Sequence, residues 1–97
     1  MSKLLLMMYS GANPQRISLV LEAHDAPGYS VLREVTGAGS GGRHEGTRAF
    51  PGTGTMLVTV VPQERVEVLQ APLRFAGAEL PAGESLHVAV LPVESFR

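Results

Sequence analysis

Apolar runs and a two-residue alternation predict four β-strands along the chain, and a longer, helical period predicts two helices. Residues 4–9 form an unbroken apolar run of strand length, which is typical of a strand that is buried on both faces. Residues 29–35 alternate between apolar and polar and predict a second strand with one face partly exposed to solvent. Residues 56–61, which are rich in β-branched side chains, and residues 86–91, stopped by Pro92, predict the third and fourth strands.

The longer period, with apolar residues three and four positions apart, first appears after the first strand. Asn13 followed by Pro14 is typical of an N-cap and a first-turn proline. Apolar residues then recur at helical spacing at Ile17, Val20 and Leu21. We expect this helix to end near residue 23, because the sequence Asp-Ala-Pro-Gly that follows disfavours helical backbone.

The helical period returns after the third strand. Pro62 opens this second helix, and apolar residues follow at helical spacing at Val66, Leu69 and Leu73. Pro72 lies inside the pattern, where it removes an intrahelical hydrogen bond and crowds the preceding turn. The sequence therefore predicts that the second helix is kinked or ends at Pro72.

The elements follow one another as strand, helix, strand, strand, helix, strand. Right-handed crossovers between the strands of each strand-helix-strand unit place both helices on the same side of one sheet. This order predicts an α+β, ferredoxin-like βαββαβ sandwich, with an antiparallel four-stranded sheet and a long loop between strands 2 and 3. A chain of 97 residues has room for one core, so residues 1–97 are expected to be a single domain.

Two helices on one face leave the other face of the predicted sheet uncovered. Positions on both faces of the central strands are apolar, so Leu5, Met7, Leu57 and Val61, or the residues that alternate with them, must point to the uncovered side. An apolar sheet face of this kind requires a partner. We expect another copy of the chain to cover it in a closed homo-oligomer.

Composition narrows the classes of partner. Eight Lys and Arg against nine Asp and Glu give a net charge of -1, which provides no electrostatic footprint for nucleic acid or an anionic membrane surface. No apolar run approaches the roughly 20 residues that span a bilayer, so no membrane insertion is expected. The chain has no cysteine, which excludes disulfides, thiolate zinc sites and cysteine nucleophiles and fits a cytoplasmic protein.

The connection at residues 36–55 is the least ordinary part of the sequence. It holds seven of the eleven glycines and is far longer than the few residues that a strand-to-strand connection needs. One interpretation is a solvated, flexible insertion without a role. The other is functional: glycine N–H groups approach anions closely, Arg43 and Arg48 offer bidentate contacts to phosphate or carboxylate, and His44 titrates near neutral pH or binds a metal.

Neither enzyme motifs nor nucleotide-loop motifs are complete in this chain. The glycine run 37–42 is not followed by a predicted helix, so it satisfies neither the dinucleotide fingerprint nor the phosphate-binding loop. None of the three histidines, His24, His44 and His87, stands at metal-binding spacing from another. We interpret His24 and His87 as structural, because catalytic roles require neighbouring partners. No catalytic residue is therefore expected.

Three segments together resemble the P-II (PII) signal-transduction family and its PII-like relatives. They are residues 28–39, which begin Gly-Tyr-Ser-Val, the run Val60-Val61-Pro62, and residues 87–94, which read His-Val-Ala-Val-Leu-Pro-Val-Glu. The last segment is the most specific, because that family ends its fourth strand in a similar leucine-proline-valine-glutamate run. The spacing of the segments also agrees with the family, and they extend over most of the chain.

The resemblance implies a non-enzymatic regulatory protein, a homotrimer with a ferredoxin-like fold. In that family the long loop, called the T-loop, reaches out to a partner transporter or enzyme, so residues 36–55 are expected to do so here. Small anionic effectors bind in clefts between subunits near the base of that loop. The effector implied here is an adenine nucleotide, a carboxylate or bicarbonate.

The resemblance also implies which residues of this chain do the binding. The expected effector-binding residues are Thr36, Gly37, Gly39, Arg43, Arg48, Leu91 and Pro92. The expected partner-binding residues of the loop are Arg43, His44, Glu45, Arg48 and Phe50.

Because of several departures, the chain resembles the divergent PII-like proteins more closely than the nitrogen-regulatory members. The loop glutamine that contacts nucleotide in that family falls here near the run Ser40-Gly41-Gly42 and is missing. The second loop, residues 77–84, has two glutamates and no lysine, where the family uses a lysine-rich loop to hold phosphates. The basic C-terminal segment is largely absent, and no tyrosine lies in the long loop.

Two other functions remain open at this point. His44 and Glu45 from symmetry-related loops could assemble a divalent-metal site, since other trimeric proteins of this fold bind divalent ions. Alternatively, the loop docks into a partner without any ligand.

Overall fold

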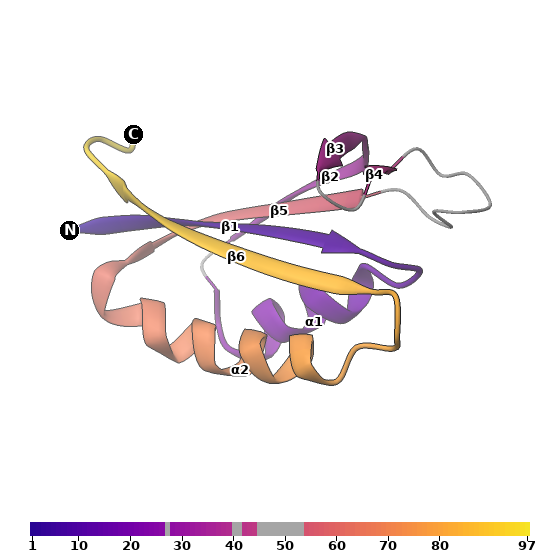
Figure 1. Cartoon of the computed structure of the whole chain (residues 1–97). Coiled ribbons are helices and arrows are strands. Elements are labelled where there is room, and N and C mark those ends of the chain that lie inside the picture. The colour runs from indigo at the N-terminus through magenta and orange to yellow at the C-terminus, as the bar shows by residue number, and fades with distance from the viewer. Residues whose placement is uncertain (27, 40–41, 45–53) are drawn as a thin grey trace.

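The central strands of the sheet are the two most apolar runs of the sequence, and both helices pack on one side of them (Figure 1). The structure, a computed structural model, describes residues 1–26, 28–39, 42–44 and 54–97. Its main elements are β1 (Ser2–Ser10), α1 (Gln15–Ala23), β2 (Ser30–Val35), β5 (Gly54–Pro62), α2 (Val66–Ala78) and β6 (Ser85–Val93). A short hairpin, β3 (Gly37–Gly39) and β4 (Gly42–His44), follows β2, and the 3-10 turn η1 (Gln63–Arg65) precedes α2.

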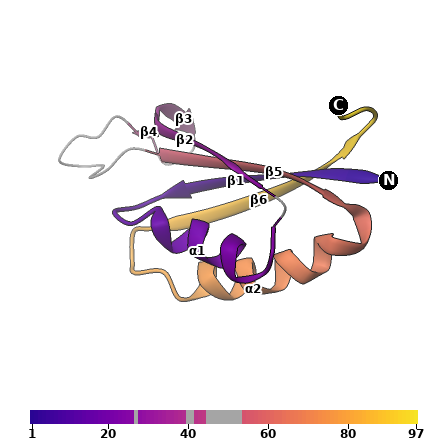
Figure 2. The same ribbon diagram turned by 180° about the vertical axis from the view of Figure 1, so that it is seen from behind.

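The sheet has the order β2-β5-β1-β6, and all its neighbours are antiparallel. Strands β1 and β5 lie in the centre, while β2 and β6 are the edges, as both sides of the molecule show (Figures 1 and 2). The two helices cover the same face of the sheet. This arrangement confirms the ferredoxin-like βαββαβ fold that the order of elements predicted.

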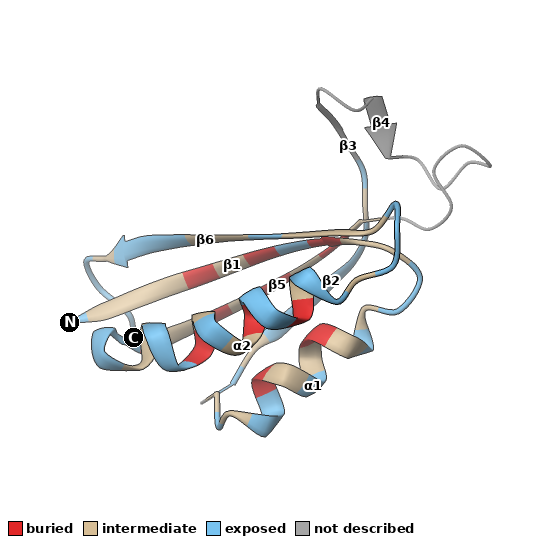
Figure 3. Ribbon diagram, turned by 60° about the horizontal axis from the view of Figure 1, so that its bottom comes forward, coloured by how far each residue is buried: buried red, intermediate tan, exposed pale blue. Residues whose placement is uncertain are grey.

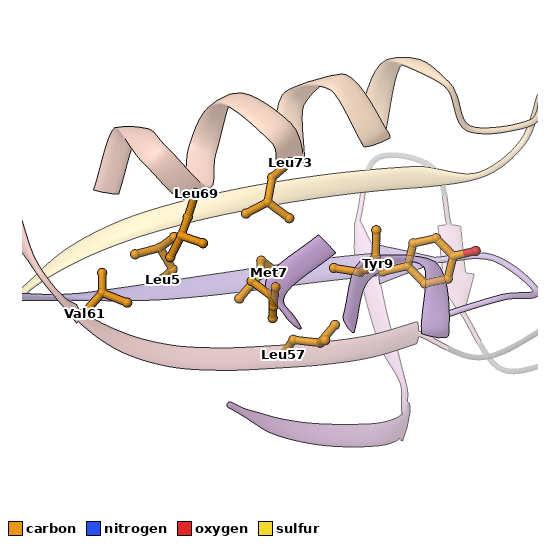
Figure 4. Close-up of a cluster of buried hydrophobic side chains, with 9 residues drawn as sticks. Leu5, Met7, Tyr9, Leu57, Val61, Leu69 and Leu73 are labelled. Carbon is orange, nitrogen blue, oxygen red and sulfur yellow. The ribbon is translucent and has the colours of Figure 1, made fainter. Parts of the chain in front are cut away.

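The core lies between the helices and alternate residues of the central strands. Because successive side chains of a strand point to opposite faces, every second residue of β1 and β5 faces the helices. The resulting cluster of side chains with at most 1% exposure is Leu5, Met7, Tyr9, Ile17, Leu21, Leu57, Val61, Leu69 and Leu73 (Figures 3 and 4). Burying each of the larger side chains stabilises the fold by roughly 1.5–3 kcal/mol.

The opposite face of the sheet, which we call the open face, is apolar and has no covering layer within the described part of the chain (Figure 1). The strand pairing assigns Leu5, Met7, Leu57 and Val61 to the helix face, so the residues that alternate with them form the open face. Its apolar residues are Leu4, Leu6, Met8, Leu32, Met56, Val58, Val60, Ala89, Leu91 and Val93. The expected burial of residues 4–9 on both faces therefore does not occur within one chain.

Helix α2 does not end at Pro72, strand β6 does not stop at Pro92, and Asn13 does not cap α1. Helix α2 continues through Pro72 to Ala78, because the carbonyl of Val68 that loses its donor lies on the exposed side of the helix. Strand β6 likewise includes Pro92, since an edge strand can leave a position without an N–H donor. The cap of α1 is Pro14 without a side-chain hydrogen bond, so the expected capping by Asn13 is wrong.

The second strand is shorter and less regular than its alternation suggested. Strand β2 begins at Ser30, which leaves Tyr29 in the preceding connection. Its pairing with β5 shifts register between Leu32 and Val35, and Glu34 within this bulge has φ +56°. A bulge turns the end of an edge strand. The regular alternation of residues 29–35 is therefore broken just before the long connection begins.

Candidate functional site

The base of the long connection lies at one end of the sheet, beside two other connections. Across this end Val35 pairs with Gly54, Gly54 with Ser10, and Ser10 with Ser85. The chain leaves the sheet after Val35 and is back in it at Gly54, and the hairpin β3–β4 follows directly from β2 (Figure 1). The turn between β1 and α1 and the connection between α2 and β6 lie at the same end.

A buried tyrosine and a glutamate join these two neighbouring connections. The Tyr9 hydroxyl donates to Glu84 Oε1 at 2.7 Å, and the Ala12 N–H donates to Glu84 Oε2 at 3.3 Å. The Asn13 N–H in turn donates to the Tyr9 hydroxyl at 3.0 Å. We call this set of contacts the Tyr9–Glu84 clamp. It holds the second loop, whose acidic character the sequence showed, against the start of α1.

The clamp leaves no room for a side chain on the turn beneath it. A Cβ atom built on Gly11 would lie 2.4 Å from the Tyr9 hydroxyl and 2.5 Å from Glu84 Cδ. Real Cβ atoms do not approach other atoms this closely. Glycine at position 11 is therefore required by the close approach of the two side chains, and the carboxylate of Glu84 is engaged within the protein.

The clamp also changes the acidity of the tyrosine. Burial, reinforced by the hydrogen bond to the Glu84 carboxylate, raises the pKa of the Tyr9 hydroxyl above its usual value of 10.0. The Asn13 N–H and the Arg16 charge act in the opposite direction but do not cancel the increase. Tyr9 therefore stays a neutral donor to Glu84 throughout the physiological range.

A second feature, which we call the edge pocket, lies where β2 begins. It has a volume of ≈ 300 Å³ and is bounded by the connection before β2, by β5 and by the C-terminal tail. Its wall is fixed by two hydroxyl groups: Thr59 donates to the Gly28 carbonyl, and Tyr29 donates to the Glu22 carboxylate. The lining residues are Gly28, Tyr29, Ser30, Val58, Thr59, Val60 and Phe96.

The residues expected to bind an effector lie in two separate places. Thr36 is exposed between β2 and β3, Gly37 and Gly39 are in β3, and Arg43 is in β4 opposite Ala38. Leu91 and Pro92 lie in β6, opposite Leu4 and Lys3 of β1. Residue 4 is six strand positions from residue 10 at the base of the long connection, which corresponds to about 20 Å. One chain therefore does not bring the two groups together.

The residues expected to bind a partner are only partly placed. His44 pairs with Gly37 across the hairpin, and Arg43 precedes it in β4. Glu45, Arg48 and Phe50 lie outside the described residues.

The residues of the edge pocket were not among those expected from the sequence. One signal could have pointed to it, because Thr59 is the only polar residue in the run 56–61 and is 2% exposed. A buried hydroxyl needs a hydrogen-bond partner, and here the partner is the backbone before β2. The contribution of Phe96, from the end of the chain, has no such signal.

Neither a metal cluster nor a membrane-spanning helix is present in the part of the chain that the structure describes. Among those residues no three His, Asp or Glu side chains gather closely enough to hold a metal ion. The divalent-metal alternative thus gains no support, although Glu45 lies outside the residues described. No helix in the same ranges is long and apolar enough to cross a membrane.

No protein-family model matches the chain, and no curated protein matches it in sequence. Solved structures do match it over nearly its whole length. CPII of Thiomonas intermedia K12, a nitrogen regulatory PII-like protein bound to ADP, AMP and bicarbonate, is 20% identical with a TM-score of 0.67, covering 99% of this chain and 96% of that one.

Two further solved structures agree with this likeness. A PII-like signalling protein from Thermus thermophilus is 19% identical with a TM-score of 0.64, covering 92% of this chain and 83% of that one. Arabidopsis thaliana PII bound to citrate is 16% identical with a TM-score of 0.66, covering 95% of this chain and 77% of that one. The fold of this chain is therefore that of PII and PII-like proteins, as the resemblance in sequence implied.

The structure makes the role of Gly11 directly testable. Replacing Gly11 with Ala forces the Tyr9–Glu84 clamp apart, so we expect the free energy of unfolding to fall by roughly 1–3 kcal/mol, as for overpacked sites. Urea unfolding followed by circular dichroism measures it. Gly28→Ala is the matched control, because a Cβ at that position meets nothing within 4 Å. Equal stability of the two variants would contradict the clamp.

The raised pKa of Tyr9 predicts a loss of stability in alkali. Above pH 10 the unfolded chain releases the Tyr9 proton while the folded chain retains it, so the free energy of unfolding falls as pH rises. The contribution of Tyr9 is complete below pH 10 and is lost as pH rises through the folded pKa. In Tyr9→Phe we expect a shallower fall, measured as urea midpoints between about pH 9 and 11. Parallel pH curves for the two proteins would exclude this coupling.

Proposed function

We propose that this protein is a PII-like regulatory protein rather than an enzyme. It binds a small anionic effector, which is an adenine nucleotide, a carboxylate or bicarbonate, and it engages a partner transporter or enzyme through residues 36–55. The observation that carries this proposal is that the chain shares its fold, over 99% and 95% of its length, with proteins bound to ADP, AMP and bicarbonate and to citrate. We also propose that the protein is cytoplasmic.

The open face supports assembly into a homotrimer. Ten apolar side chains line it, and Met8, Leu32 and Leu91 are each at least 40% exposed in the single chain. A continuous apolar face of this kind marks an interface, and a second and third copy of the chain cover it without any further protein. Three copies are the number that the resemblance to PII proteins implies.

The separation of the expected effector residues also fits such an assembly. In a closed ring of three copies, each contact joins two different patches of neighbouring chains. The end that carries Thr36 and Arg43 on one copy can then adjoin Leu91 and Pro92 of the next, although they lie about 20 Å apart within one chain. We place the anionic part of the effector at this junction, where Arg43 supplies a fixed positive charge.

The proposed response of residues 36–55 is a shift between populations of conformations. An effector changes these populations only by binding one conformation more tightly than another. The residues that begin the segment, Thr36 and Gly37, lie at the proposed binding end. An effector bound there therefore favours some conformations of the segment over others. The partner protein binds only the favoured conformation.

The trimer is tested by placing a charge on the open face. Leu6 lies in the middle of β1 on that face, so Leu6→Glu introduces a buried, unpaired carboxylate into the proposed interface while leaving the helix-side core untouched. In light scattering we expect the wild type to have about three times the 10.3 kDa mass of one chain. The variant should have the mass of a single chain. Leu19→Glu, on the exposed side of α1, is the control and should remain trimeric. A monomeric wild type would refute the assembly.

The effector is tested by calorimetric titration with AMP, ADP, citrate and bicarbonate. We expect at least one to bind, and Arg43→Ala to weaken that ligand roughly 10- to 150-fold through loss of a charge-assisted hydrogen bond. Arg74→Ala, which removes an exposed arginine of α2 on the helix side, should leave the affinity unchanged. Binding of Zn²⁺ alone, abolished by His44→Ala, would instead support the divalent-metal alternative.

A further inference from the structure

Helix α2 carries a second apolar stripe besides the one that packs in the core. The buried stripe consists of Leu69, Leu73 and Ala76. A further set of apolar residues repeats every three and four positions and is exposed: Val68, Ala71, Phe75 and Ala78. Phe75 is 69% exposed, the second-largest value among the large hydrophobic residues between Ser2 and Val93 apart from none on the sheet. The a and d positions of a coiled coil have this spacing, and they pack against another helix.

The exposed stripe lies on the flank of α2 that is turned away from β6. Another flank carries Gln70 and Gly77, which line a pocket of ≈ 330 Å³ together with Leu86 and Val88 of β6. Helix α1 lies on the other side of α2 from this strand (Figure 3). The exposed stripe therefore faces solvent on the side where α1 lies.

Two arginines fix how the helices lie against each other. Arg16, at the start of α1, donates to the Glu79 carbonyl at the end of α2 at 3.4 Å. Arg65, just before α2, donates to the His24 carbonyl at the end of α1 at 2.7 Å. The helices are therefore antiparallel, and each has a positive charge at its C-terminal end, where the helix dipole favours one.

The flank of α1 that faces α2 is also apolar and exposed. Residues three, four and seven positions apart share one side of a helix. Leu19 and Ala23 follow Arg16, whose side chain reaches α2, by three and seven positions, and Leu19 is 61% exposed. The exposed apolar residues of both helices thus adjoin. We call this set the helix strip: Leu19, Ala23, Val68, Ala71, Phe75 and Ala78.

The surroundings of the helix strip are acidic. Residues 11–29 and 63–84, the helices with their connections, hold six Asp and Glu against three Arg. Glu22, Asp25 and Glu64 are exposed where α1 ends and α2 begins. Basic residues of a partner are attracted to this end. A second copy of the chain in a two-fold contact would instead place the same acidic layer opposite itself, and an anionic membrane would meet like charge.

We propose that the helix strip docks an amphipathic helix of another protein. The apolar face of that helix packs against Phe75 and Leu19, and its basic residues lie beside Glu22 and Glu64. The helix strip is on the other side of the sheet from the open face, and none of its residues belongs to residues 36–55. Docking there requires no effector, so this inference goes beyond the proposed function and does not depend on it.

A synthetic peptide tests the docking site. The probe is a fluorescein-labelled peptide of about 14 residues, two heptads, with leucine at the a and d positions and lysine elsewhere. We expect saturable binding to the full chain in fluorescence anisotropy. Phe75→Glu, and Leu19→Glu on the other helix, should each weaken binding at least roughly tenfold, as for aromatic and apolar anchors of an interface. Phe96→Glu is the matched control, because Phe96 is 71% exposed but lies in the C-terminal tail.

The acidic surroundings and the position of the peptide are tested separately. A peptide with glutamate in place of lysine should not bind, and affinity for the lysine peptide should fall as NaCl is raised from roughly 50 to 500 mM. The chain has no tryptophan, so Phe75→Trp creates a single indole in the helix strip. Its emission should shift to shorter wavelength when the lysine peptide covers it, whereas the emission of Phe96→Trp should not change.

Three results would overturn the proposal. One is the absence of peptide binding to the wild type. Another is equal binding by the wild type, Phe75→Glu and Leu19→Glu, because the peptide then binds elsewhere. The third is a wild type that doubles its assembly mass in light scattering and loses this doubling in Phe75→Glu, because a second copy then covers the helix strip. None of these results affects the effector titrations, which test the proposed function independently.

Discussion

Burial on only one side of the sheet is the constraint on which the rest of this structure depends. Strands β1 and β5 carry apolar residues at both sets of alternating positions, yet both helices of the fold lie on the same face. The helix face becomes a core in which Leu5, Met7 and Leu57 are fully buried. The open face retains apolar side chains that gain stability only when another surface covers them. The same sequence feature therefore builds the core and supports the proposed assembly.

Periodicity was sufficient to predict the fold because the core follows it closely. The apolar runs at residues 4–9, 56–61 and 86–91 and the alternation of residues 29–35 located the four main strands. The spacing of Ile17 and Leu21 and of Leu69 and Leu73 located both helices. The predictions that were wrong rested on the local conformational preference of a single residue. Pro72 was expected to kink or end its helix and Pro92 to stop its strand, but α2 continues to Ala78 and β6 to Val93. The carbonyl that loses its donor to Pro72 lies on the exposed side of α2, and Pro92 lies in an edge strand. Tertiary context therefore overrode local preference.

The candidate site could be predicted only in part, because its contacts join residues that are distant in sequence. The hydrogen bond from Tyr9 to Glu84 spans 75 positions, and no local pattern connects them. The same holds for Phe96, which lines the edge pocket together with Gly28 although the two residues are 68 positions apart in sequence. The resemblance to the PII family predicted that Thr36 and Leu91 belong to the same effector site. It could not show that they lie at opposite ends of the sheet within one chain.

Strand β2 runs from the edge pocket to the base of the long connection. Its first residue, Ser30, lines the edge pocket, and its last, Val35, lies at the base of residues 36–53. As an edge strand it is held in the sheet by β5 alone, and the register shift after Leu32 interrupts that pairing. A bulge bends its strand and increases the local twist. The bulge in β2 therefore sets the direction in which the chain leaves the sheet after Val35, whereas the Tyr9–Glu84 clamp holds the turn before α1 and the loop before β6 together.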